Sequence, residues 1–164
     1  MKGVVLVGVA AMCVGAGAAG VAEVRAAEGS ARMEAVMPVA LREYIDARIG
    51  EFDLIPAERR AVLEELAAFV RGRAAAGEAC DLTFICTHNS RRSHLGQVWA
   101  AVGAAQFGIR GVTTYSGGTE ATAFNPRAAA ALERAGIEVE QTTEGANPIY
   151  HVRFAEGAAP VTCF

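Results

Sequence analysis

A polar loop between an expected strand and an expected helix constrains the fold of this chain more than any other stretch. Residues 82–85 are a short apolar run rich in β-forming side chains, which predicts a buried strand. The apolar residues after the loop recur at helical spacing and predict an amphipathic helix: Leu95, Val98, Trp99 and Val102. The loop starts with Cys86 and reaches Arg92 six positions later. A strand, a short loop and a helix in this order are typical of α/β folds.

The loop has the chemistry of an anion-binding nucleophile. A loop that runs from a strand end into a helix start directs backbone N–H groups at one point, where the helix dipole adds positive potential. Arg92 can hold two oxygens of a tetrahedral anion with its planar guanidinium. The same groups stabilise a thiolate, so we expect the pKa of Cys86 to lie below the free value of about 8.5. Cys86 is therefore a candidate nucleophile toward a bound oxyanion.

Two further loop residues support this interpretation. We expect Ser93 to cap the helix and to donate a hydrogen bond to the Cys86 sulfur. Asn89 tolerates the left-handed backbone that a tight loop requires. The alternative is that Cys86 is only a small buried hydrophobe at a strand end and that its spacing from Arg92 arises by chance. The strand before the loop, and the serine and the helix after it, favour the catalytic interpretation.

The loop also resembles a known active site. Its sequence is Cys86-Thr87-His88-Asn89-Ser90-Arg91-Arg92-Ser93. It is similar to the active-site loop of the low-molecular-weight protein tyrosine phosphatase superfamily, and its Thr-x-Asn-Ser pattern is closest to the arsenate reductase branch. A second similarity follows at residues 115–120, Tyr-Ser-Gly-Gly-Thr-Glu, and at the Asn-Pro pair of residues 125–126. The resemblance covers about residues 82–140.

The resemblance implies a fold and a set of site residues. The fold is α/β, a small parallel-sheet three-layer fold of the phosphotyrosine protein phosphatase I type. Cys86 and Arg92 would be catalytic, and Ser116 would hydrogen-bond Asn89 and, together with Ser93, support the loop. Seven residues would bind the oxyanion: Thr87, His88, Asn89, Ser90, Arg91, Arg92 and Ser93. The resemblance implies no metal and no cofactor, although an arsenate reductase requires an external thiol, for which thioredoxin and glutaredoxin are candidate carriers.

Three functions stay open at this point. In the first, Cys86 attacks arsenate, and a second thiol resolves the thiol–arsenate adduct. In the second, the chain is a protein tyrosine phosphatase or a phosphatase of small phosphomonoesters, with a phosphocysteine intermediate. In the third, the chain is a non-catalytic remnant that still binds an anion. We expect the first, arsenate reduction, with arsenate or a phosphate-type oxyanion as the ligand.

The C-terminal part of the chain lacks features that the resemblance implies. Relatives supply either an Asp-Pro general acid or resolving cysteines, but this chain has no aspartate after Asp81. The only cysteine after Cys86 is Cys163. We therefore expect a domain whose C-terminal part is missing. Losing a general acid costs typically about 10²–10⁴-fold. Arsenate reduction would suffer less, because water or hydroxide is an easier leaving group than an alkoxide.

The N-terminal region predicts export. Residues 1–22 contain one lysine followed by an uncharged apolar stretch, and residues 20–22, Gly-Val-Ala, offer a small-residue cleavage site. This pattern is typical of a signal peptide, with a membrane anchor as the alternative. We expect a periplasmic or secreted protein, whereas translation from Met33 or Met37 would leave it in the cytoplasm. Residues 23–37 are expected to be a linker.

Residues 38–79 are expected to form a helical extension. One helix should open at Pro38 and close at Gly50, and a second should run over residues 56–73. Their apolar faces are expected to point inward: Leu41, Tyr44, Ile45, Ile49, Val62, Leu63, Leu66, Phe69 and Val70. We expect these helices to pack against the domain that occupies residues 80–164, and the alternative is a lid or a docking hairpin.

The remaining elements complete an α/β domain. We expect a strand over residues 112–116, parallel to a central strand at residues 82–86 that has helices on both faces. Asn125 should cap a helix that has Pro126 at its first position and ends at Gly136. Residues 149–154 and 160–164 should form a hairpin.

Other side chains around the motifs receive simpler interpretations. We expect His88 and His94 to shape the loop or its rim, and Thr119 and Glu120 to organise the second turn. The net charge of −3 and the lack of a basic tract argue against nucleic-acid binding. The four cysteines show neither a paired metal spacing nor a disulfide framework.

Overall fold

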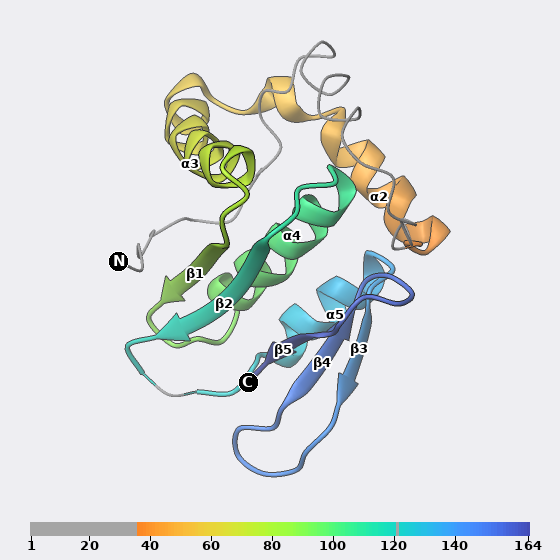
Figure 1. The fold of residues 1–164 in the computed structure, drawn as a ribbon. Coiled ribbons are helices and arrows are strands. Elements are labelled where there is room, and N and C mark those ends of the chain that lie inside the picture. Colours follow the sequence, from red (N-terminus) through yellow and green to blue (C-terminus); the bar gives the residue numbers. More distant parts are fainter. Residues whose placement is uncertain (1–35, 121) are drawn as a thin grey trace.

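The computed structural model describes residues 36–120 and 122–164 (Figure 1). The elements are α2 (Val39–Ile49), the 3₁₀ helix η2 (Phe52–Leu54), α3 (Ala57–Ala75), β1 (Cys80–Cys86), α4 (Arg92–Gln106), β2 (Val112–Gly118), α5 (Pro126–Arg134), β3 (Glu138–Gln141), β4 (Tyr150–Arg153) and β5 (Val161–Cys163). The predicted signal peptide or anchor, and the linker up to residue 35, lie outside the described residues. Within them, no helix has both the length and the apolar character that a membrane crossing requires.

Prolines and glycines set the ends of the first helix as predicted. Pro38 is the N-cap of α2, and Gly50 is its C-cap. A proline at a helix start costs nothing, because the N–H that it lacks would have no partner within the helix. Leu41 and Ile45 are buried in the core, whereas Tyr44 lies nearer the surface and stacks on Trp99 with ring centroids 5.4 Å apart.

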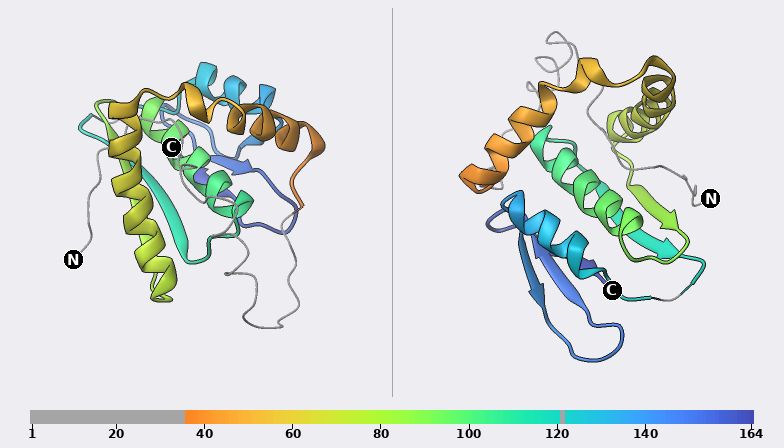
Figure 2. Two further views of the ribbon diagram at one scale, coloured as in Figure 1. Left: turned by 90° about the horizontal axis from the view of Figure 1, so that it is seen from above. Right: turned by 180° about the vertical axis from the view of Figure 1, so that it is seen from behind.

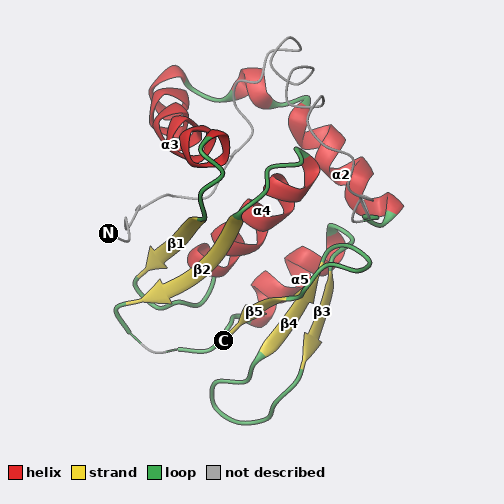
Figure 3. Cartoon of the chain, viewed as in Figure 1, coloured by secondary structure: helices red, strands yellow, loops and turns green. Residues whose placement is uncertain are grey.

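The second helix packs through a narrower stripe than its sequence predicts. α3 buries Leu63, Leu66 and Val70. Val62 and Phe69 were also expected to point inward, but they are 48% and 44% exposed, so this prediction is wrong. The reason is that α3 joins the hydrophobic cluster of β1 only through Leu66 and Val70. Figure 3 shows α3 leading directly into β1.

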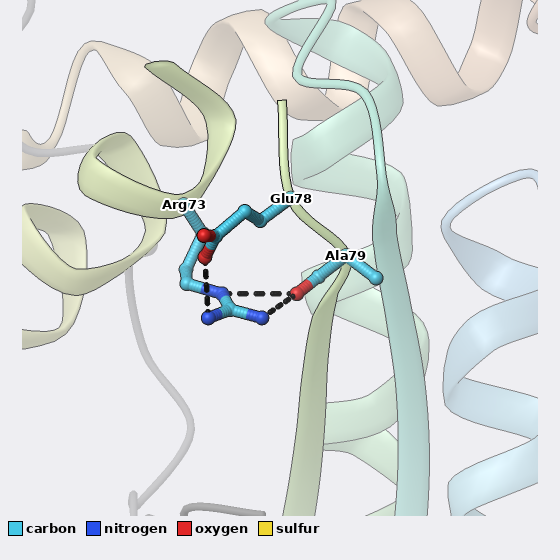
Figure 4. Close-up of polar contacts among 3 residues, drawn as sticks. All are labelled: Arg73, Glu78 and Ala79. Atoms are coloured by element: carbon cyan, nitrogen blue, oxygen red, sulfur yellow. Dashed lines mark hydrogen bonds and ion pairs between the residues drawn. The ribbon is translucent and has the colours of Figure 1, made fainter. Parts of the chain in front are cut away.

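A single arginine fixes the turn between α3 and β1. The Arg73 guanidinium donates two hydrogen bonds to the Ala79 carbonyl, at 3.0 and 2.6 Å, and forms an ion pair with Glu78 at 2.6 Å. Figure 4 shows these contacts where the chain leaves the helix and enters the strand. The arginine thereby satisfies a carbonyl at the strand entrance and sets the direction in which β1 starts.

β1 and β2 form a parallel pair joined through α4. The register aligns Cys80 with Val112 and Cys86 with Gly118. The α/β prediction is confirmed, and the second strand extends two residues beyond the predicted range of 112–116. β1 was expected to be central in its sheet, but in the part of the chain that the structure describes it pairs only with β2. The parallel pairing nevertheless brings both carboxyl ends to one edge.

The parallel pair buries one face. Alternate β1 residues Cys80, Leu82 and Phe84 share a hydrophobic cluster with Leu66 and Val70 of α3 and with Ala100 of α4. The other face is open to solvent at three positions: Asp81, Thr113 and Tyr115. The two-residue alternation of a strand explains why neighbouring residues of β1 differ so strongly in burial.

The C-terminal strands form a separate antiparallel sheet in the order β3-β4-β5. The predicted hairpin of β4 and β5 is confirmed, with Tyr150 opposite Cys163. β3 was not predicted, because its sequence, Glu-Val-Glu-Gln, has only one apolar residue. Seen from behind, α4 and α5 lie on the same side of the two sheets (Figure 2).

The larger core cluster links α2 to the C-terminal sheet. It contains buried side chains of α2, α4 and α5 and of the antiparallel sheet, among them Leu41, Val98, Leu132 and Val152. Gln97 of α4 also joins the two sheets, since its side-chain amide donates to the carbonyls of Thr114 in β2, at 3.2 Å, and Thr162 in β5, at 3.0 Å. The loop that follows β1 therefore leads into α4, a helix that is hydrogen-bonded to both sheets.

Candidate functional site

The first loop lies where β1 ends and α4 begins. Arg91 is the N-cap residue of α4 but makes no side-chain capping bond, so the prediction that Ser93 caps this helix is wrong. Ser93 lies one residue inside the helix and is 2% exposed. Its hydroxyl oxygen lies 3.2 Å from Cys86 Sγ and 2.9 Å from Asn89 Oδ1. The hydroxyl has a single proton, and donation to a charged sulfur is the stronger of its two options.

Cys86 is held as a thiolate near neutral pH. Partial burial alone would raise the pKa of its thiol, but hydrogen bonds to the sulfur outweigh this effect and lower the pKa to about 6. The donors are the hydroxyl of Ser93 and the backbone N–H groups of Ser93, Ser90 and His88. Donors that point at the ionised form stabilise it relative to the neutral form. The structure thus has the thiolate geometry that the sequence predicts.

Asn89 makes the sharp turn of the loop. Its φ is +42°, in the left-handed region, and the residue is 8% exposed. Gly118 lies against it so closely that a Cβ at residue 118 would come within 2.5 Å of the Asn89 nitrogen. The Asn89 amide donates to the Phe164 carbonyl at 3.1 Å. Ser116 was expected to hydrogen-bond Asn89. The partners that the structure shows for the Asn89 side chain are instead the Phe164 carbonyl and the Ser93 hydroxyl.

A second loop, residues 119–125, ties down the carbonyls of the first. The N–H of Glu120 and the hydroxyl of Thr119 donate to the Thr87 carbonyl, at 2.8 and 3.1 Å. The Thr122 hydroxyl donates to the His88 carbonyl. The carbonyl of Ser90 likewise accepts from the Asn125 N–H at 2.9 Å. Because these carbonyls face the second loop, N–H groups of the first loop are left to face the sulfur.

An open pocket of about 350 Å³ lies above Cys86. Its lining residues are Cys86, His88, Ser90, Arg91, Arg92, Thr122 and Asn125. Five of them are predicted site residues, whereas Thr87, Asn89 and Ser93 contribute to the loop and do not line the pocket. Thr122 and Asn125 were not predicted to line it. Asn125 has a visible signal in the Asn-Pro pair, and it also caps α5 by accepting from the Arg127 N–H at 3.0 Å.

The pocket mouth carries uncompensated positive charge. Arg91 and Arg92 are both exposed, and neither forms an ion pair within the described residues. At the same mouth, His88 Nε2 lies 3.1 Å from the Glu120 carboxylate, with both side chains more than half exposed. No group of three or more His, Cys, Asp or Glu residues in ranges 36–120 and 122–164 is arranged to hold a metal ion. The local field therefore favours an anion.

His94 and Cys163 are too deeply buried to react with a ligand in the pocket. His94 was expected to shape the loop or its rim. It does not lie at the rim, because it is fully buried, with its ring 4.6 Å from that of Phe124. Burial lowers the pKa of His94, which keeps the imidazole neutral. Cys163 is also fully buried, and burial raises its pKa to about 12. In this arrangement Cys163 is a core residue and not a second reactive thiol.

The segment that forms this site is similar to a known protein family. Residues 81–154 match the model of the low molecular weight phosphotyrosine protein phosphatase family. This phosphatase-like segment contains both loops, and the match supports a Cys-dependent enzyme of the superfamily of phosphatases and arsenate reductases. It makes no choice between the two activities. No curated protein and no solved structure matches the chain.

Proposed function

We propose that the phosphatase-like segment is a Cys86-dependent enzyme that reduces arsenate through a thiol–arsenate adduct. The observation that carries this proposal is the lining of the pocket, which has a thiolate below and two arginines at the mouth. Among the described residues of the lining, His88 has the only aromatic ring and the charged side chains are the two arginines, which suits a small anion. A compact inorganic anion needs only N–H donors and guanidinium groups.

The chemistry starts with attack of the Cys86 thiolate on arsenic. A sulfur–arsenic bond forms, and one arsenate oxygen leaves as water after accepting a proton. Arg92 and the loop N–H groups hold the other oxygens and stabilise the charge that develops on them. A second thiolate then attacks the Cys86 sulfur, and the electron pair of the sulfur–arsenic bond stays on arsenic, which is reduced from As(V) to As(III). Another thiol finally reduces the mixed disulfide and restores Cys86.

The second thiol has to come from outside the described residues. Their other cysteines, Cys80 and Cys163, are both buried, and burial raises the pKa of each. A raised pKa and lack of access both suppress thiol–disulfide exchange. We therefore propose a small thiol or a thiol carrier of the thioredoxin or glutaredoxin kind as the electron donor. No cofactor is required in this scheme.

Hydrolysis of small phosphomonoesters is the second candidate, and the family match favours it. The same thiolate would attack phosphorus, and water would release phosphate from the phosphocysteine. The two activities share the pocket, and they differ in the leaving group and in the nucleophile that attacks the intermediate. In arsenate reduction water leaves and a thiol attacks, whereas in phosphomonoester hydrolysis an alcohol leaves and water attacks. Export to the periplasm or beyond, as the N-terminal sequence predicts, would agree with an inorganic oxyanion substrate.

One set of assays tests the proposal. The purified protein is incubated with arsenate and with glutathione or a thioredoxin system, and arsenite formation is measured beside thiol consumption. Arsenite formation that Cys86→Ser abolishes supports arsenate reduction. Hydrolysis of p-nitrophenyl phosphate without arsenite formation would assign the segment to the phosphatases. Anion protection of Cys86 without either reaction would identify a non-catalytic remnant.

A further inference from the structure

A histidine–carboxylate pair lies at the mouth of the pocket, where a proton donor is needed. The His88 side chain lines the pocket together with Cys86, and His88 Nε2 lies 3.1 Å from Glu120 Oε2. Among the described residues that line the pocket there is no aspartate or glutamate. The residues expected to shape the rim and to organise the second turn therefore meet beside the pocket that holds Cys86.

We propose that His88, oriented by Glu120, transfers protons to the leaving oxygen and from the incoming nucleophile at this pocket. This inference rests on the proposed oxyanion chemistry of Cys86. It makes His88 a catalytic residue and Glu120 a positioning residue.

The backbone fixes His88 with respect to the sulfur. Its N–H donates to Cys86, while its carbonyl accepts from the Thr122 hydroxyl. The imidazole therefore projects from a residue that is held on both sides. Since Glu120 accepts the proton on Nε2, Nδ1 is the ring nitrogen left for the substrate. A carboxylate on one imidazole nitrogen sets the tautomer and stabilises the protonated ring, as in other nucleophile–base arrangements.

The proton balance closes for both candidate reactions. As the sulfur–arsenic or sulfur–phosphorus bond forms, the bond to the leaving oxygen breaks, and Nδ1–H gives that oxygen its proton. Water leaves from arsenate, or an alcohol leaves from a phosphomonoester. Neutral His88 then takes a proton from the incoming thiol or from the incoming water. The imidazolium is restored, and no other proton carrier is required.

Four charged or titratable groups face the imidazole. The Cys86 thiolate and the Glu120 carboxylate attract the imidazolium that forms during proton transfer, whereas the guanidinium groups of Arg91 and Arg92 repel it. The Glu120 carboxylate lies in direct contact with the ring. Removing its charge should therefore slow proton transfer by the ring.

The competing explanation is that the ion pair only fastens the second loop to the first. Three other bonds already perform that task, since Thr119 and Glu120 bind the Thr87 carbonyl and Thr122 binds the His88 carbonyl. A purely fastening role predicts that loss of the pair disturbs the Cys86 thiolate. A proton-transfer role predicts that the thiolate is unchanged and that only the chemical step slows.

The test measures single-turnover consumption of the Cys86 thiol by arsenate, and release of phenol from phenyl phosphate, across pH. The variants are His88→Asn, His88→Ala with and without added imidazole, and Glu120→Gln. The matched control is Glu140→Gln, which removes an exposed carboxylate paired with Arg153 at 3.6 Å on the antiparallel sheet. Alkylation of Cys86 by iodoacetamide across pH reports on the thiolate in every variant.

We expect His88→Asn to slow the chemical step by about 10²-fold or more while the alkylation profile of Cys86 stays unchanged. Imidazole should restore the rate of His88→Ala, and Glu120→Gln should slow the chemical step less than His88→Asn does, with Glu140→Gln like the wild type. An unchanged rate in His88→Asn would overturn the inference, as would a parallel fall in rate and in Cys86 alkylation. A wild type that reacts with neither anion would instead refute the proposed function.

Discussion

Cys86 and Cys163 lie at the ends of strands in two different sheets, and their thiols have opposite acidity. Partial burial of Cys86 is outweighed by hydrogen-bond donors, and its pKa falls to about 6. Burial of Cys163 meets no such opposition, and its pKa rises to about 12. The two side chains are chemically identical, so the difference comes from the burial and the hydrogen-bond donors that surround each sulfur.

Strand topology explains that difference. β1 leads through a loop into a helix, and the loop leaves N–H groups that have no partner in a sheet or a helix. β5 is a hairpin strand whose residues pair with β4, including Cys163 with Tyr150. The strand pairs with β4 in the antiparallel ladder, and the Cys163 thiol donates to an acceptor, Gln97 Oε1, at 3.7 Å. An acceptor beside a thiol favours the neutral form.

The largest predicted effect is the difference between replacing one cysteine and replacing the other. Cys86→Ser should lower the single-turnover rate with arsenate or an aryl phosphate by about 10⁴-fold or more, because the nucleophile is lost. Cys163→Ala should leave that rate unchanged and reduce the free energy of unfolding by about 1 kcal/mol, since only packing is lost. Rapid-quench kinetics and urea unfolding measure the two quantities. A comparable loss of rate in Cys163→Ala would end the contrast between the two thiols.

The two neighbouring arginines offer the next test. Arg92→Ala should lower the rate by about 10²–10³-fold, because a donor to the transition-state oxygens is removed. Arg91→Ala should cost about tenfold at most, since Arg91 contributes only positive potential at the pocket mouth. Steady-state kinetics over a range of ionic strength measure both effects, and the Arg91 effect should fade as salt screens it. Equal losses from the two variants would mean that both arginines hold the anion.

Close approach of the two loops makes Gly118 a sensitive position. In Gly118→Ala, the new Cβ would lie 2.5 Å from the Asn89 nitrogen, so the first loop must shift. We expect a rate loss of about 10²-fold from the misplaced donors, and a loss of about 1–3 kcal/mol in the free energy of unfolding. Gly72→Ala is the control, since a Cβ there meets nothing within 4 Å. Residue 72 lies inside α3, so Gly72→Ala should raise the free energy of unfolding by about 0.5–1 kcal/mol and leave the rate unchanged.

The reactive loop was predictable from the sequence because its signals are local. An apolar run, a cysteine, an arginine and an amphipathic helix lie within one short segment, and local spacing fixes how they meet. The same locality predicts α2 between Pro38 and Gly50, and α5 after Asn125. In each case a capping or φ-restricted residue marks the boundary.

Features that depend on contacts between distant residues could not be predicted from the sequence. Thr122 lines the pocket only because the second loop folds over the first, and no motif records that contact. His94 follows the loop directly, yet its helix position turns it into the core against Phe124. β3 has too few apolar residues to stand out and forms because β4 offers an edge. Such outcomes are decided by tertiary packing, which residue spacing alone does not encode.

The smallest predicted effect separates the contribution of one hydroxyl to the Cys86 thiolate. Alkylation by iodoacetamide requires the thiolate, so its rate in the wild type should rise with pH, pass half of its maximum near pH 6, and be level at higher pH. Ser93→Ala removes one donor to the sulfur and leaves the backbone donors in place. Its half-maximum should therefore lie at higher pH, by up to about one unit, which lowers the rate at pH 6 by about fivefold at most.

Ser90→Ala is the matched control for that prediction. The Ser90 hydroxyl donates to the Ala123 carbonyl at 2.8 Å and does not contact the sulfur, so the alkylation profile of Cys86 should keep its wild-type midpoint. Cys163 should stay unreactive up to about pH 9 in all three proteins, because burial keeps its thiol neutral. A midpoint that is unmoved in Ser93→Ala would assign the whole acidity of Cys86 to the backbone of the loop. A midpoint near the free-thiol value would assign most of it to the single hydroxyl of Ser93.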